Sequence, residues 1–199
     1  HQRFLQTPEG RLYAAAKDGD LEGVAKAVRG EGARLDVPHP EFGSPPLVIA
    51  TLHGHTEVVH FLLEEGAEIE QRNRFGWTPL LAASSRGHLT LAGYLVARNA
   101  DVKAQDRMGR TPLHNAVAIG CEPLAKGLIE EKADVNARTK DGKTVLSVEL
   151  GRPRRESKEL ENILTSLMGL PFPKGYVSGM LKDRPPAFAL LFPGQGSQR

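Results

Sequence analysis

The chain has 199 residues, 40% of them hydrophobic and 25% charged, with a formal net charge of +2 at pH 7. This composition indicates one soluble domain with a tail, and no apolar run approaches the length needed to cross a bilayer. The net charge is too small to indicate nucleic-acid binding, so no nucleic-acid partner is expected. Cys121 is the only cysteine, which excludes an intrachain disulfide and permits the cytosol, the nucleus or an organelle interior.

The most informative feature is a set of residues that recurs every 33 positions. The recurring residues are Gly43, Gly76, Gly109 and Gly142; Pro46, Pro79 and Pro112; Leu47, Leu80, Leu113 and Leu146; Ala50, Ala83 and Ala116; and Gly54, Gly87 and Gly120. A fixed period of this length predicts a stack of small units of one design, each contacting mainly its neighbours. One unit cannot bury its own apolar faces, so three or more must stack.

The first unit, residues 8 to 41, departs from this spacing. Its first helix is expected to run through Leu12 and to end at Gly19, but Leu12 lies 35 residues before Leu47. We expect the additional length in the loop around residues 37 to 40. Departures of this kind are typical of the end of a stack, where one face has no neighbour.

Three middle units, residues 42 to 74, 75 to 107 and 108 to 140, follow one plan. In the second of them, Gly76 permits the positive φ of a tight turn, and Thr78 with Pro79 opens a short helix that ends at Gly87. A second helix follows from Leu89 with an apolar stripe at helical spacing. The plan is therefore a helix-turn-helix unit with a projecting turn.

The last unit, residues 141 to 168, departs from the plan again. Val145 stands in the place of the proline and Glu149 in the place of the alanine. Polar substitutions suit a face that has no further neighbour. A basic cluster at residues 152 to 158 lengthens the connection, and we interpret it as a solvated loop rather than a nucleic-acid site.

These units resemble ankyrin repeats. The motifs that carry the resemblance are Gly76-Trp77-Thr78-Pro79-Leu80, Gly87-His88, Ala100-Asp101-Val102, Gly109-Arg110-Thr111-Pro112-Leu113-His114 and Ala133-Asp134-Val135-Asn136. The resemblance covers residues 8 to 168 and implies an all-α ankyrin-repeat domain at 1 to 168, a solenoid of about five helix-turn-helix units. It also implies a non-enzymatic protein–protein interaction module, scaffold or subunit of a larger assembly.

An ankyrin stack implies a binding groove formed by the turn tips and by residues along the inner helices. The partner-binding residues expected there are Phe42, Arg74, Phe75, Trp77, Arg86, Arg107, Met108, Arg110, Ile119, Lys140 and Lys143, with Ser44, Leu52, His53, Ser85 and Asp141 beside them. Aromatic, methionine and arginine side chains are enriched at interface hot spots. Because cations outnumber acids in this set, we expect a protein partner with an acidic surface. The alternative for Trp77 is packing against its own turn.

Seven histidines raise the question of a metal site, and His53 with His55 is the closest pair in sequence. No carboxylate or cysteine accompanies them at ligand spacing, so neither a metal nor a cofactor is expected. The ankyrin resemblance implies instead that His55, His88 and His114 bond to the backbone of turns and helices. Cys121 stands where His55 and His88 stand in earlier units, and we interpret it as a packing residue rather than a reactive thiol.

The repeat spacing stops after residue 168. Prolines break any continuing helix beyond that point, so residues 169 to 186 are predicted to be a linker. Residues 187 to 199 form a predicted extended tail, in which an apolar run as long as a buried strand precedes a glycine-rich turn. An ankyrin stack offers no sheet, so we expect this tail to dock on a partner or on a downstream domain.

Residues Phe192 to Gln198 resemble the Phe-Pro-Gly-Gln-Gly-Ser-Gln signature at the start of malonyl-CoA:acyl carrier protein transacylases. In that family the second glutamine of the turn contributes its backbone to the oxyanion hole, a role that the resemblance gives to Gln198. The family's nucleophilic serine, general-base histidine and substrate-binding arginine have no counterpart here. The chain as it stands is therefore not predicted to be an enzyme.

Three interpretations of the tail stay open: the front of an ankyrin–transacylase fusion, a docking peptide left from a lost transacylase, and coincidence. The first makes the chain the amino-terminal targeting region of an acyltransferase and suggests a plastid or a mitochondrion within a generally intracellular assignment. The chain begins at His1 without a methionine, which indicates processing or cutting. Residues 1 to 12 show neither a secretory signal nor a transit peptide.

Overall fold

The chain folds into a single-file stack of helical pairs, seen in a computed structural model that describes residues 2–145 and 147. The elements are α1 (Gln2–Leu5), α2 (Pro8–Asp18), α3 (Leu21–Ala25), the π-helix η1 (Lys26–Gly30), α4 (Pro46–His53), α5 (Thr56–Glu64), α6 (Pro79–Arg86), α7 (Leu89–Ala97), α8 (Pro112–Ile119) and α9 (Glu122–Glu130). The all-α repeat solenoid is thus confirmed. Most of the predicted fifth unit, the linker and the tail with Gln198 lie outside the described residues.

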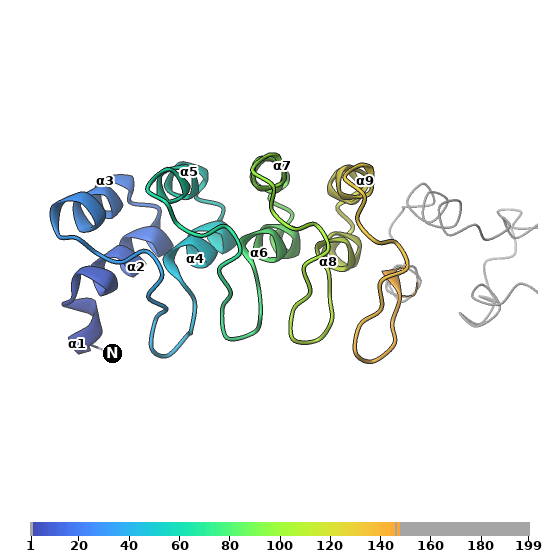
Figure 1. Cartoon of the computed structure of the whole chain (residues 1–199), viewed down its shortest axis with the longest axis horizontal. Coiled ribbons are helices and arrows are strands. Elements are labelled where there is room, and N and C mark those ends of the chain that lie inside the picture. The colour runs from blue at the N-terminus through green and yellow to red at the C-terminus, as the bar shows by residue number, and fades with distance from the viewer. Residues whose placement is uncertain (1, 146, 148–199) are drawn as a thin grey trace, which may run out of the picture.

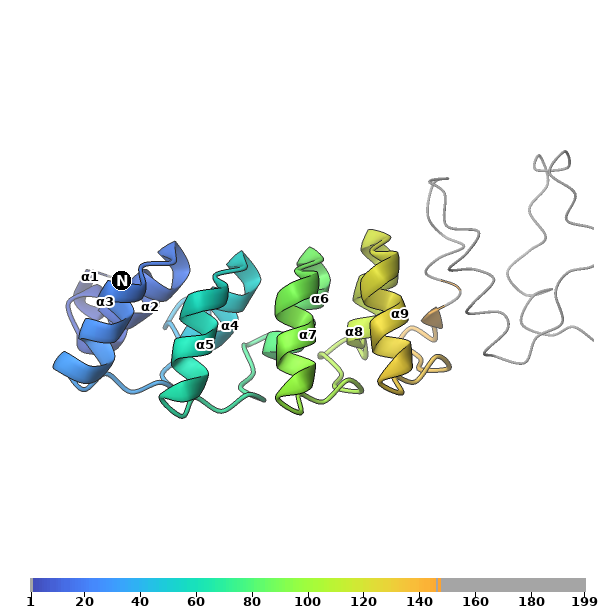
Figure 2. The same cartoon turned by 90° about the horizontal axis from the view of Figure 1, so that it is seen from above.

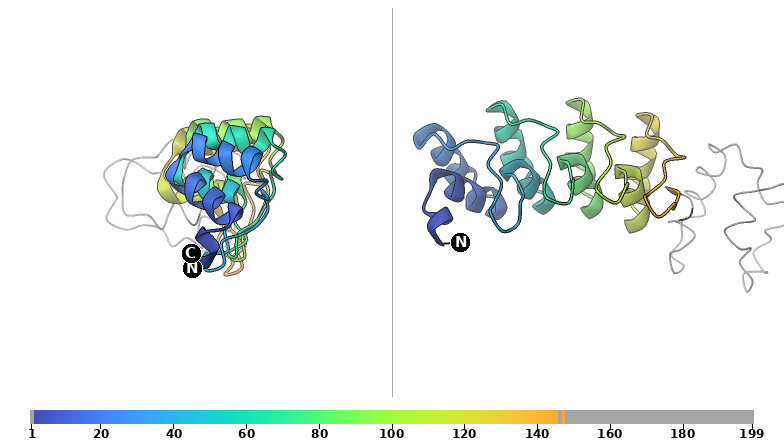
Figure 3. Two further views of the ribbon diagram at one scale, coloured as in Figure 1. Left: turned by 90° about the vertical axis from the view of Figure 1, so that its left-hand side faces the viewer. Right: turned by 60° about the horizontal axis from the view of Figure 1, so that its bottom comes forward.

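The helices form two layers, and long loops project from the stack on the side away from the outer layer (Figure 1). The inner layer contains α2, α4, α6 and α8, which pack on one another in chain order. The outer layer contains α3, α5, α7 and α9, which lie side by side when the stack is seen from above (Figure 2). Viewed along the stack, the projecting loops overlie one another (Figure 3).

Each inner helix from α4 onward begins with a proline and ends at a glycine, and α6 and α8 also have a threonine N-cap. A proline occupies the first helical position, where its missing N–H costs nothing, as at Pro79 after the N-cap Thr78. The Thr78 hydroxyl accepts a hydrogen bond from the Leu81 amide at 3.3 Å, which satisfies one free helix donor. Each helix then ends at a left-handed glycine, such as Gly54 at φ 77° and Gly87 at φ 71°.

The core lies between the layers and between successive units. Leu47, Leu80 and Leu113 are at most 1% exposed, and each occupies the same position of its inner helix. Fully buried alanines at the next recurring position, such as Ala83, leave room for neighbouring helices to approach closely. The 33-residue period is therefore the period of a continuous core, built from equivalent side chains of successive units.

The two additional residues of the first unit lie at two separate places. In the later units the backbone hydrogen bond just after the second helix spans five residues, as from Ala67 N to Leu62 O. In the first unit the equivalent bond, from Ala33 N to Ala27 O, spans six. The first additional residue is therefore accommodated in η1, because a π-helical turn contains one more residue than an α-helical turn. The second lies at the loop tip, so assigning all of the additional length to residues 37 to 40 was wrong.

Imidazoles join successive inner helices at their C-terminal ends. His55 Nε2 lies 2.8 Å from the carbonyl oxygen of Lys17, and His88 Nε2 lies 3.2 Å from that of Leu52. Each ring covers the glycine that ends the preceding inner helix. In the next unit Cys121 takes this place at the start of α9 and forms no disulfide.

We expect Gly54→Ala to destabilise the stack more than Gly66→Ala does. Both positions have positive φ, at 77° and 93°, so alanine at either costs about 1–2 kcal/mol of backbone strain. A Cβ at residue 54 would also lie 2.8 Å from Cε1 of His88, whereas a Cβ at residue 66 meets nothing within 4 Å. Urea unfolding should therefore show a further loss of about 1–3 kcal/mol for Gly54→Ala. Equal losses would refute the packing role of this glycine.

Candidate protein-binding surface

Four projecting hairpins form the surface to which the sequence analysis assigned binding. We call their tips, residues 39–44, 73–77, 106–110 and 139–143, the hairpin ridge. The glycine amide inside each tip forms one backbone bond, and a second backbone bond closes the tip, for example from Asn73 N to Trp77 O at 3.1 Å and from Asp106 N to Arg110 O at 3.0 Å. In the first hairpin this bond spans one residue more, from His39 N to Ser44 O, which accounts for the second additional residue.

Backbone hydrogen bonds also join each tip to the next. The amides of Arg74, Arg107 and Lys140 donate to the carbonyl oxygens of Gly43, Phe75 and Met108, at 3.0, 3.0 and 2.8 Å. The tips therefore form one continuous row with a fixed register, although each comes from a separate loop.

The row carries large apolar side chains that face solvent. Phe42, Phe75 and Met108 occupy the same place in three successive hairpins and are 47%, 53% and 58% exposed. Phe42 stacks on His39 with ring centroids 4.7 Å apart, and the guanidinium of Arg74 lies 4.8 Å from the centre of the Phe75 ring. Asp141 takes this place in the fourth hairpin. Contiguous exposed apolar residues on a folded domain are typical of an interaction site.

Cations flank the apolar tips. Arg74, Arg107 and Lys140 are exposed, one residue before each tip, while Glu41 stands at this position of the first hairpin. Among the described residues no ion pair neutralises these three cations. The fourth hairpin differs at its other flank, where Lys143 Nζ lies 3.1 Å from a carboxylate oxygen of Asp141.

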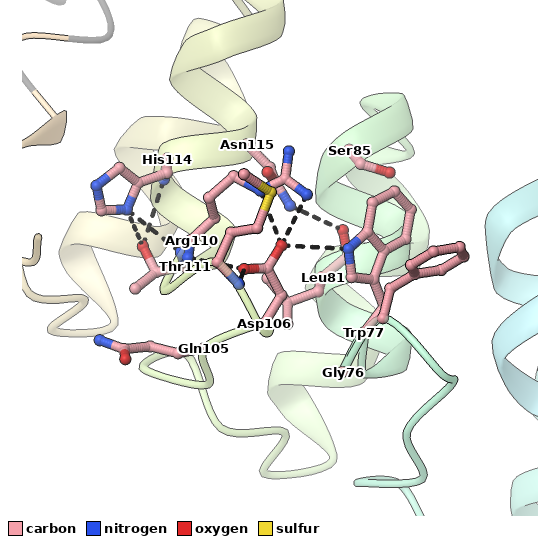
Figure 4. A network of polar contacts seen from close by, with 12 residues as sticks. Gly76, Trp77, Leu81, Ser85, Gln105, Asp106, Arg110, Thr111, His114 and Asn115 are labelled. Atoms are coloured by element: carbon pink, nitrogen blue, oxygen red, sulfur yellow. Dashed lines mark hydrogen bonds and ion pairs between the residues drawn. The ribbon is translucent and has the colours of Figure 1, made fainter. Parts of the chain in front are cut away.

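Two predicted contact residues are held in a network between the second and third hairpins (Figure 4). Trp77 Nε1 donates to Asp106 Oδ2 at 3.3 Å, and Arg110 Nε donates to the same oxygen at 2.8 Å. The Asp106 side chain is 1% exposed and also accepts from the amides of Met108 and Arg110. The Trp77 indole thus bonds to the turn of the next unit, while its backbone bonds to Asn73 in its own turn, and Arg110 is neutralised by its ion pair.

Asp106 itself was missed by the sequence analysis. Its equivalent one unit earlier is Asn73, whose Oδ1 accepts from the amides of Phe75 and Trp77 at 2.9 Å. An Asn or Asp that bonds to backbone amides two and four residues on is a known device for closing turns. The Asn73/Asp106 pair at the 33-residue spacing was the signal that could have identified it.

A second row of predicted contacts lies at the C-terminal ends of the inner helices. His53, Arg86 and Ile119 are equivalent residues there, and all three are exposed, Ile119 at 42%. Leu52 and Ser85 are half-buried, and the Ser85 hydroxyl donates to the carbonyl oxygen of Ala82. Ser44 is 7% exposed and is therefore unavailable as a contact, because it closes the first hairpin.

His114 joins the ridge to the inner helices. Its Nδ1 accepts from the Thr111 amide at 3.3 Å while the Thr111 hydroxyl accepts from the His114 amide, and its Nε2 lies 3.4 Å from the carbonyl oxygen of Lys143. Beside it, Asn115 Nδ2 donates to the carbonyl oxygen of Leu81 at 3.3 Å. These bonds connect the fourth unit to the units on both sides, so all three predicted backbone-bonding histidines have such contacts.

Comparison with known proteins identifies the family. A family model for ankyrin repeats in three copies matches residues 12–106, and the single ankyrin-repeat model matches residues 108–140. The chain belongs to the ankyrin-repeat family. A curated relative, "Probable E3 ubiquitin-protein ligase XBOS32" of Oryza sativa subsp. japonica, is 45% identical over 65 residues, which is 32% of this chain and 13% of that protein. The chain therefore spans only a small part of the relative that it matches.

Ankyrin repeats indicate a protein–protein interaction module and are generally non-catalytic. Within residues 2–145 and 147, the structure has no helix long and apolar enough to cross a membrane. In the same part of the chain, His, Cys, Asp and Glu side chains do not gather in threes as metal ligands would.

Replacing Asp106 should separate its charge from its turn-closing role. Asp106→Ala leaves the indole N–H and two amides without their acceptor, so we expect the free energy of unfolding to fall by about 2–3 kcal/mol. Asp106→Asn keeps an acceptor for the two amides, as Asn73 does one unit earlier, but places an NH2 group against the indole and the Arg110 guanidinium. We therefore expect a smaller loss of about 1–2 kcal/mol. Urea unfolding followed by the fluorescence of Trp77, the single tryptophan, measures both. Equal losses would show that the ion pair, not the turn, dominates.

Acid should weaken the stack through His114, which is 2% exposed. Burial lowers the pKa of its imidazole, and the bond to Lys143 and the carboxylates of Asp106 and Asp134 only partly oppose this. As the pH falls below about 6.5, the unfolded chain takes up the proton before the folded chain does, so the free energy of unfolding decreases.

Urea unfolding between about pH 8 and pH 5 tests this expectation, with His114→Gln as the comparison. The variant should lose less stability on acidification than the parent. Some loss should persist, because burial also lowers the pKa of His39 and His53. An identical slope for both proteins would contradict the assignment to His114.

Proposed function

We propose that this chain is a non-enzymatic interaction module, acting as a scaffold or subunit of a larger assembly, and that its hairpin ridge is the binding surface. The observation that carries the proposal is the row of Phe42, Phe75 and Met108, about half exposed each and fixed in register by the tip-to-tip backbone bonds. Because these bonds fix the spacing of the tips, the backbone of the row loses little entropy on binding. Phenylalanine and methionine side chains are also enriched at protein interfaces relative to the rest of the surface.

The charge beside this row supports an acidic partner. Arg74, Arg107 and Lys140 recur next to the apolar tips, and Arg86 is exposed at the end of α6. Arg110 is excluded from this group, since Asp106 already neutralises it. An acidic surface would be steered toward the ridge and held in register by this row, an effect that salt weakens.

Replacing the apolar tips should reduce partner binding without unfolding the stack. We expect Phe75→Ala with Met108→Ala to weaken binding by at least about 2 kcal/mol, roughly thirtyfold in affinity, because two large apolar contacts are removed. The stack should stay folded, because both side chains face solvent in the free protein. Leu89→Ala is the matched control, since Leu89 is 44% exposed but begins the outer helix α7.

The measurement is quantitative affinity purification from the native source, with each variant compared with the parent at equal urea stability. Proteins lost with the tip variant but retained with Leu89→Ala are ridge partners. Retention of every partner by the tip variant would refute the ridge as the binding surface. Trp77 and Arg110 are unsuited to this test, because their loss also breaks the Asp106 network.

A second candidate function rests on residues 192–198, which match the opening signature of malonyl-CoA:acyl carrier protein transacylases. On this proposal the repeats are the targeting region of an acyltransferase fusion, and an organelle such as a plastid or mitochondrion is its location. The transcript decides between the two candidates. A downstream segment containing Gly-His-Ser would support the fusion, and a stop codon near residue 199 would refute it.

A further inference from the structure

We propose that the hairpin ridge binds a polyproline II segment of its partner, in which an apolar residue followed by an acidic residue recurs every third position. This inference rests on the proposed function, because it specifies what lies on the same surface.

The first step is a match of two periods. Successive inner helices pack at about 8–10 Å, and the ridge repeats once per unit, so equivalent tip residues recur at about that distance. A polyproline II helix has three residues per turn and rises about 3.1 Å per residue, so it presents the same face every 9.3 Å or so. Such a segment can place one side chain against Phe42, Phe75 and Met108 in turn.

A β-strand suits the ridge less well. Strand addition needs free backbone donors and acceptors, but the amides of Arg74, Arg107 and Lys140 and the carbonyl oxygens of Phe75 and Met108 already bond along the row. A strand also returns to the same face every two residues, about 6.7 Å, which falls out of step with the tips. Recognition here must therefore use side chains rather than the backbone ladder.

An α-helix matches the spacing only once in seven residues, about 10.5 Å, so most of its residues would face away from the ridge. A polyproline II segment makes one contact in three residues and is already a common conformation of unfolded chains. It consequently loses less conformational entropy for each contact formed. Proline-rich segments of this kind also pack well on aromatic side chains, as Phe42 and Phe75 offer.

The order of residues in the ligand follows from the order on the ridge. Two of the three apolar tips have a cation one residue before them, in the pairs Arg74–Phe75 and Arg107–Met108. An apolar side chain over the tip with a carboxylate beside it meets both groups of one unit. Glu41 replaces the cation in the first hairpin and Asp141 replaces the apolar tip in the fourth, so the complete apolar–acidic pair of the ligand should lie on the second and third hairpins.

The test measures binding of fluorescent peptides to the full chain by anisotropy. The first peptide has four Pro-Glu-Ser repeats, the second has the same composition with its three residue types in blocks, and the third is a proline-free helix with Leu and Glu at seven-residue spacing. We expect the first to bind at least about tenfold more tightly than either of the others. Equal affinities, or tighter binding of the helix, would overturn the proposal.

Variants then test the register. Arg107→Ala should weaken the periodic peptide about tenfold, while Arg98→Ala, which removes the same charge from the end of α7, should not. Glu41→Arg extends the cation row by one unit and should tighten binding of the four-repeat peptide by severalfold. No gain for Glu41→Arg, or an equal loss for both arginine variants, would contradict the register.

Failure of the inference is distinguishable from failure of the proposed function. If all three peptides bind equally and Phe75→Ala with Met108→Ala weakens them all, the ridge is a binding surface but the period is wrong. If no peptide binds and the same double variant also retains every native partner, the proposed function is wrong as well.

Discussion

The architecture depends on one backbone constraint, the left-handed residue that ends each inner helix. The residues are Gly19, Gly54, Gly87 and Gly120. Their φ values lie between 71° and 78°, which glycine adopts without strain. The turn sends the chain into the outer layer after only about two helical turns. The missing side chain matters equally, because the next unit places His55 against Gly19 and His88 against Gly54. Reversal of the chain and contact between units are thus achieved by the same residue.

The ridge inherits its regularity from this stacking. The packing of α4, α6 and α8 on one another brings the hairpins that precede them close together. Each tip can then donate a backbone hydrogen bond to the preceding tip. The residue that opens each tip then varies while its role persists: an imidazole at His39, an amide at Asn73, a carboxylate at Asp106 and a hydroxyl at Thr139 all accept from amides of the same turn. The turn requires an acceptor, not a particular side chain.

This tolerance explains what the sequence could and could not predict. The helices, their order and the exposed tips follow from strictly spaced Gly, Pro and Leu, because those positions have one chemical solution. Asp106 was missed because its position accepts four residue types, so it shows no simple repeat. The pairing of Trp77 and Arg110 with it depends on side-chain geometry between units, which spacing does not encode. The additional residue that lies in η1 was predicted in the wrong loop for a related reason. A single inserted residue does not change the residue types around it, so the sequence does not show where it lies.

The charges on the ridge show how structure and recognition are divided among similar residues. Arg110 lies beside a buried carboxylate, so its charge is used within the protein, and removing Asp106 would leave it unpaired. Arg74, Arg107 and Lys140 recur at about one Debye length in physiological salt, where mutual repulsion is weak but not absent. Their backbone amides hold the tips together, and their side chains are exposed. Carboxylates of a ligand would face these three cations, and the proposal of an acidic partner rests on that arrangement.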